Sequence, residues 1–167
     1  KFANFNQISF QPNERWAFSL FEGAIYKSYD TQNGRINPKT SFYVPILGFS
    51  MSDKDKSSNL IYGFDWSFKM FKNWKIYNQF SSKHLNKIGM QFGLKCQNPF
   101  NLNRSFVNIE FNSIPSAFYS MDSSNIFQRY SHLAHELAHP LGSGLSELLL
   151  KGQFSFNHLF FRFSYNY

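Results

Sequence analysis

The chain has 167 residues, a length that suits one domain and is too short for two of ordinary size. Aromatic residues make up 20% of it, yet no stretch reaches the roughly 18–20 uninterrupted apolar residues of a membrane-spanning helix, so a helical membrane protein is excluded. The net charge of +7 is spread thinly, without the block of like charges that is typical of a nucleic-acid-binding tail.

Alternation of apolar and polar residues predicts a series of β-strands along the chain. The first two predicted strands are 2–10 and 14–26, separated by a short polar turn. The segment 28–40 is rich in Asp, Asn, Gly and Pro and is predicted to be a long loop. An apolar run over 41–51 contains a proline and fits a short packed helix, a plug element or an irregular strand.

The clearest predicted strand is 60–70, where every second residue is large and apolar. It is longer than the roughly 5–6 residues of a typical soluble strand, and aromatic residues dominate its apolar side. Similar strands are predicted at 74–80, 88–96 and 104–112. Cys96 is the only cysteine, which excludes an intrachain disulfide, and its phase predicts a small apolar side chain among other apolar residues.

A second long segment, 113–146, is predicted to be a loop or an inward-folded element, and the pair 147–156 and 159–167 is predicted to form a hairpin. The predicted strands match the roughly 9–11 residues that a tilted transmembrane strand needs. Short and long connections are both present, as between the two ends of an outer-membrane barrel. The pattern predicts an all-β antiparallel transmembrane β-barrel, with a soluble β-sandwich as the alternative.

Polar residues occupy the phase opposite to the large apolar residues in several of the predicted strands. In a barrel this phase faces the lumen, where paired charges fill the interior. A charge-filled interior is favoured over an open transport channel. The residues predicted to face the lumen are Asp65, Lys69, Gln91, Lys95, Glu110 and Arg162.

The segment His135-Glu136-Leu137-Ala138-His139 spells HExxH, which on a helix places two imidazoles one turn apart for zinc, with the glutamate as general base. This alternative reading predicts a zinc metallopeptidase and a helix over 131–139. However, Pro140 disfavours a helical conformation at His139, and Leu145 occupies the third-ligand position of the longer motif. We therefore expect no catalytic residues, no metal and no cofactor.

The residues around this motif carry a resemblance to a known family. Tyr130-Ser131-His132, then Leu137 to Gly142, then Glu147 resemble a signature of the capsule-assembly Wzi-like outer-membrane proteins, in their Bacteroidota branch of RemB-like gliding-motility proteins. Further matching blocks follow in order along the chain: Glu22 to Tyr26, Ser57 to Asp65, Ile76 to Phe80, Ile88 to Lys95 and Val107 to Phe111.

The resemblance implies a non-enzymatic β-barrel in the outer membrane of a Gram-negative bacterium of the Bacteroidota. It implies contact with outer-membrane lipid and lipopolysaccharide, and a role with surface or capsular polysaccharide or with other outer-membrane proteins in a gliding-motility or type IX secretion assembly. No nucleic-acid partner is expected. Full-length members of the family are much longer, so residues 1–167 are expected to form part of a larger barrel. A soluble all-β carbohydrate-binding module remains the alternative.

Two sets of site residues follow from this resemblance. Glu22, His132 and His139 are predicted to form a buried polar network that pins an inward loop to the barrel wall. Loop residues that combine an aromatic platform with polar partners are candidates for glycan binding: Tyr29, Asn33, Arg35, Tyr119 and Arg129.

Overall fold

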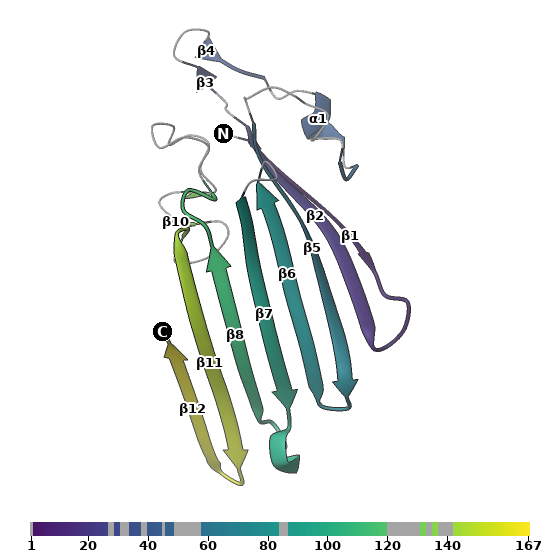
Figure 1. The fold of residues 1–167 in the computed structure, drawn as a ribbon, viewed down its shortest axis with the longest axis vertical. Helices are drawn as coiled ribbons and strands as arrows, with labels where there is room; N and C mark the ends of the chain where they lie inside the picture. The colour runs from purple at the N-terminus through teal and green to yellow at the C-terminus, as the bar shows by residue number, and fades with distance from the viewer. Residues whose placement is uncertain are drawn as a thin grey trace.

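Eight long strands dominate the computed structural model (Figure 1). They run as β1 (Phe2–Phe10), β2 (Trp16–Tyr26), β5 (Ser58–Phe71), β6 (Trp74–Lys83), β7 (Lys87–Gln97), β8 (Phe106–Ile114), β11 (Leu145–Phe156) and β12 (Leu159–Asn166). The residues that the structure describes are 2–26, 29–30, 34–37, 40–44, 46–48, 58–83, 87–119, 131–132, 135–136 and 142–167.

Smaller elements lie in the connections between the long strands. Two pairs of short antiparallel strands lie there. In one, β3 (Tyr29–Asp30) pairs with β4 (Gly34–Arg35), and in the other, β9 (Ser131–His132) pairs with β10 (His135–Glu136). The one-turn helix α1 (Thr40–Tyr43) begins the apolar run after β4, and the 3₁₀ turn η2 (Pro99–Asn101) follows β7. Among the described residues, no helix has the length and apolar character needed to cross a membrane.

The eight long strands form one antiparallel sheet in the order β1-β2-β5-β6-β7-β8-β11-β12, so each strand pairs with the next long strand along the chain. The predicted all-β antiparallel architecture is confirmed. The sheet is open: within the described residues, β1 and β12 each pair with a strand on one side only. The structure therefore shows a curved sheet (Figure 1) and not a closed barrel.

Pairing register divides the sheet into two faces, because residues directly opposite each other on neighbouring strands point to the same side. We call one side the apolar face. One row of directly paired positions on it crosses seven strands with apolar residues only: Trp16, Phe68, Ile76, Leu94, Ile109, Leu150 and Tyr165. We call the other side the polar face, and it carries the intervening residues of the same strands.

Connections at the two ends of the sheet differ in length. At the lower end of Figure 1 the strands are joined through 11–15, 72–73, 98–105 and 157–158. The connections 27–57 and 115–144 lie at the opposite end, together with the short connection 84–86. We call these the turn end and the loop end.

The main hydrophobic cluster lies at the loop end, on the polar-face side of the sheet. Pro115 cannot donate a hydrogen bond to a neighbouring strand, so β8 ends at Ile114 and the chain turns back over the sheet. Phe118, which is 1% exposed, then packs against Ile25, Ile61 and Ile114. Residues 115–119 therefore cover the loop end of the polar face.

Candidate functional site: the polar face of the sheet

All six residues predicted to share one polar side of the sheet lie on the polar face. The register places Gln91 beside Gln79 and Asn112, and Glu110 beside Gly93, on the same side as Lys95. The other three take the corresponding positions on β5 and β12: Asp65, Lys69 and Arg162.

A carboxylate network occupies the middle of this face. The Tyr77 hydroxyl lies 2.6 Å from Glu110 Oε2 and 3.0 Å from Asn108 Oδ1. Asn112 Nδ2 donates to Glu110 Oε1 at 3.0 Å and to Glu147 Oε1 at 2.8 Å. Glu147 is buried, and hydrogen bonds of this kind offset the cost of removing a carboxylate from water. The network ties β6, β8 and β11 together through side chains.

Gly93 makes the network possible because it leaves space above β7. Any Cβ atom at Gly93 would overlap the Tyr77 ring, far inside van der Waals contact. Only a residue without a side chain lets the Tyr77 ring cross β7 and reach Glu110 on the strand beyond.

Lysines gather closer to the turn end of the same face. Lys69 pairs directly with Lys75, and Lys75 pairs directly with Lys95. The row continues through Asn108 to Lys151, so it crosses five adjacent strands. We call these five residues the lysine row.

The five residues of the lysine row line a hollow of about 580 Å³. Lys72, from the turn between β5 and β6, adds a fifth lysine to its wall. No Asp or Glu among the described residues lines this hollow. Phe106 supports the Lys95 ammonium, whose nitrogen lies 5.6 Å from the ring centroid. The polar face therefore carries an amide and carboxylate band in its middle and a positive band toward the turn end.

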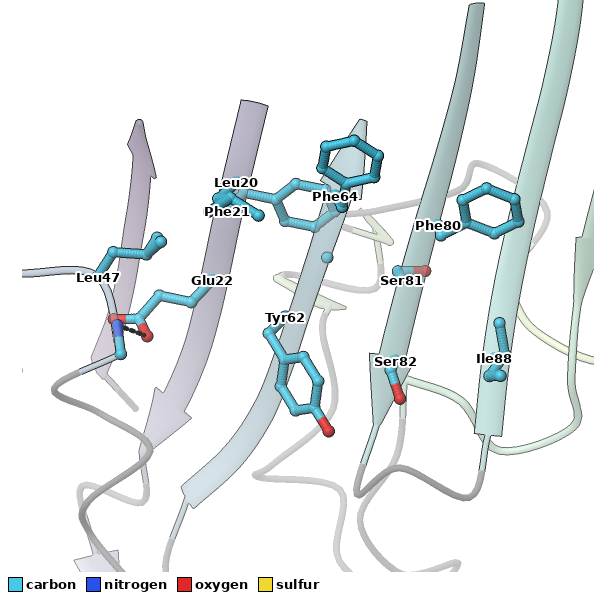
Figure 2. Close-up of a pocket in the computed structure, with 12 residues that line it drawn as sticks. Leu20, Phe21, Glu22, Leu47, Tyr62, Phe64, Phe80, Ser81, Ser82 and Ile88 are labelled. Atoms are coloured by element: carbon cyan, nitrogen blue, oxygen red, sulfur yellow. Dashed lines mark hydrogen bonds between the residues drawn. The ribbon is translucent and has the colours of Figure 1, made fainter. Parts of the chain in front are cut away.

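Glu22 lies at the loop end and on the apolar face, since it pairs with Tyr62. It is 2% exposed and accepts hydrogen bonds from Asn6 Nδ2 at 2.9 Å and from the Gly48 backbone N–H at 2.8 Å. Figure 2 shows the second contact, which holds the turn at Leu47 and Gly48 against the sheet. Glu22 thus pins a connecting segment, and that segment lies over the apolar face.

This turn and the sheet enclose a second hollow, of about 500 Å³ (Figure 2). Leu47 and Glu22 lie on one side of it, and Phe80, Ser82 and Ile88 lie on the other. Most of its lining is apolar side chain, so its chemistry suits hydrocarbon better than a sugar or an ion.

Of the two histidines predicted to join Glu22, the structure describes the backbone of His132. His132 belongs to β9, where its backbone pairs with His135 of β10, and His139 lies outside the described residues. The paired strands β9 and β10 replace the helix that the zinc reading of 131–139 requires, because Ser131, His132, His135 and Glu136 are all extended. Across the described residues, no three His, Cys, Asp or Glu side chains gather to hold a metal ion.

The glycan-binding candidates fall in two places. Tyr29 and Arg35 are direct partners in the β3–β4 pair. Tyr119 belongs to the segment over the polar face, where its carbonyl accepts from Asn59 Nδ2 at 3.0 Å and its ring meets Phe118 edge-on. Asn33 and Arg129 lie outside the described residues.

Sequence reasoning missed several members of the polar face: Lys75, Tyr77, Asn108, Asn112, Glu147 and Lys151. Each stands in the polar phase of its strand, so the alternation did contain the signal for the face. Which residues of neighbouring strands lie directly opposite one another could be determined only from the pairing register in the structure.

Comparison with known proteins adds no family to these observations: no family model, no curated protein and no solved structure matches the chain. The resemblance to the Wzi-like family therefore rests on the residues quoted for it in the sequence.

Proposed function

We propose that this chain is part of the wall of an outer-membrane β-barrel, with its apolar face against lipid and its polar face toward the barrel interior. The single observation that carries this proposal is the exposure of the apolar face. Large hydrophobic residues on it remain open to the surroundings on strands across the sheet, from Phe10 at 65% through Ile88 at 55% to Phe161 at 59%.

An exposed apolar surface of this extent is uncommon on a soluble monomer and marks a surface that meets another apolar phase. The wide apolar row from Trp16 to Tyr165 supports lipid as that phase, because a flat hydrophobic band around the outside is how barrels contact the bilayer. A soluble sandwich would instead bury this face under a second sheet, and the described residues contain one large sheet.

Strand length and the connections support the same proposal. Five of the long strands, β2, β5, β6, β7 and β11, have 10 to 14 residues, enough for a tilted strand to cross the hydrocarbon core. The loop end carries both long connections, 27–57 and 115–144, and would face outward, while the turn end would face the periplasm. The open edges β1 and β12 are where further strands would complete the wall.

The cellular role that we propose follows the resemblance: a non-enzymatic part in organising surface or capsular polysaccharide, or in a gliding-motility or type IX secretion assembly of a Gram-negative bacterium. Its support is the ordered set of family-like blocks between Glu22 and Glu147. Tyr29 and Arg35, whose backbones pair in the connection between β2 and β5, are the candidates that we propose for a glycan contact.

Tryptophan fluorescence tests the membrane placement directly, because Trp16 and Trp66 lie on the apolar face. Trp74, which also lines the hollow of the lysine row, is replaced by phenylalanine for this measurement. The chain is refolded into vesicles whose acyl chains carry bromine, a quencher that acts only at short range. We expect strong quenching by the brominated chains and weak quenching by iodide in the water phase. Quenching by iodide alone would contradict the proposal.

A matched pair of substitutions on β7 sharpens the test. Phe92→Lys places a charge on the apolar face, whereas Gln91→Lys places the same charge on the polar face one residue away, beside Glu110. We expect Phe92→Lys to lower the stability of the inserted protein by about 2–4 kcal/mol and Gln91→Lys to change it little. Equal effects would mean that the apolar face does not meet lipid.

A further inference from the structure

The lysine row is an arrangement that folding alone does not favour. Neighbouring strands lie about 4.8 Å apart, so Lys69, Lys75 and Lys95 carry three like charges on directly opposed positions. Like charges placed opposite each other destabilise a sheet. With Lys151 beyond Asn108, the row spans four strand intervals, or roughly 19 Å.

The nearest carboxylate is already engaged. Glu110 stands two residues beyond Asn108 along β8 toward the loop end, close enough to Lys151 for electrostatic attraction. However, its Oε2 faces the Tyr77 hydroxyl and its Oε1 accepts from Asn112. The lysines around the hollow therefore outnumber the one carboxylate beside them, and the space between them is open to a ligand.

We propose that the lysine row binds a soluble anion that carries several phosphate groups in a line. The cations that line the hollow are all lysines, which bind phosphate as compact point charges and do not select the planar carboxylate that arginine pairs with. The linear spacing of the row matches an extended anion better than a single ion. The choice of a soluble anion over a lipid headgroup rests on the proposed function, which turns this face away from lipid.

Tripolyphosphate is the probe for this site. The whole chain, folded in a non-ionic detergent at low ionic strength, is titrated with tripolyphosphate, and its binding is followed by calorimetry and by the unfolding temperature. The row variant Lys75→Gln/Lys95→Gln is compared with Lys87→Gln/Arg162→Gln, which removes two positive charges from the same face outside the row. We expect the row variant to bind about tenfold more weakly or worse, and the control to bind like the wild type.

The unfolding temperature without anion separates lost binding from lost folding. Because the row variant relieves repulsion, it should unfold at the same temperature as the wild type or higher. Tripolyphosphate should raise the unfolding temperature of the wild type and of the control, and leave that of the row variant unchanged. A row variant that is destabilised without anion would contradict the inference. Equal stabilisation of both variants, or the same stabilisation by sulfate at matched ionic strength, would overturn it in favour of general screening.

Anionic-lipid vesicles distinguish the source of the phosphate. If the vesicles displace tripolyphosphate from the wild type, the lysine row binds a lipid headgroup and the proposal of a soluble anion is overturned. If the vesicles displace no tripolyphosphate, the result supports a soluble anion. The bromine-quenching measurement remains independent, because Lys75 and Lys95 lie on the face opposite to Trp16 and Trp66. Failure of anion binding with quenching intact would overturn the lysine site and leave the membrane placement standing.

Discussion

The Tyr77 hydroxyl passes over Gly93 of β7 and lies 2.6 Å from Oε2 of Glu110, so one hydrogen bond joins β6 to β8 across the strand between them. Most sheet hydrogen bonds join nearest neighbours through the backbone. This side-chain bond instead fixes the spacing of three strands at once, in the middle of the polar face.

Tyr77→Phe should lower the free energy of unfolding by about 1–3 kcal/mol, because Glu110 loses a donor while the ring stays in place. Urea unfolding of the folded chain measures the change. Tyr165→Phe is the matched control, since Tyr165 is 56% exposed on the apolar face. Similar losses for the two variants would show that the bond to Glu110 contributes nothing specific.

Gly93→Ala should destabilise the sheet by about 1–3 kcal/mol, because its new methyl group overlaps the Tyr77 ring. If the overlap is the cause, the same substitution should cost less when Tyr77 is already alanine. A double-mutant cycle measures this coupling. A coupling near zero would assign the glycine's role to backbone conformation instead.

Glu22→Ala should release the turn at Gly48, whose N–H loses its acceptor. We expect hydrogen exchange at the Gly48 amide to become about tenfold faster or more, in line with the loss of a charge-assisted hydrogen bond. Glu14→Ala, in the exposed turn between β1 and β2, is the control and should leave this amide unchanged. Unaltered exchange in Glu22→Ala would mean that other contacts hold the turn.

Asn78 and Asn112 are both buried, one on each face of the sheet. Replacing them with leucine should change the free energy of unfolding in opposite directions. Asn78 lies between Trp66 and Phe92 on the apolar face, and its Oδ1 has no hydrogen-bond partner within the described residues. Asn78→Leu should therefore raise the free energy of unfolding by about 1 kcal/mol.

Asn112→Leu should lower the same free energy by about 1–3 kcal/mol, since it removes the donor shared by Glu110 and Glu147. Both changes are measured by urea unfolding under identical conditions. Stabilisation by both variants would show that the polar network does not contribute to folding.

Sequence alternation located the strands well, and its misses have local causes. The strand predicted at 60–70 is β5, Ser58–Phe71, and the one predicted at 88–96 is β7, Lys87–Gln97. The strand predicted at 74–80 continues to Lys83, because a polar run of serines gave no apolar phase to follow. The apolar run over 41–51 begins with α1, one of the three forms its composition allowed.

The sequence by itself determined which residues share a face, because side chains alternate along a strand and a period of two is visible in the printed letters. Asp65, Lys69 and Glu110 were grouped correctly on that basis. Only the tertiary structure decided which residues of a face meet. A slip of two residues between strands keeps every side chain on its face yet moves it to another row. The alignment of Lys69, Lys75 and Lys95, the bond from Tyr77 to Glu110, and the folding of the Gly48 turn onto Glu22 all depend on pairings between distant parts of the chain.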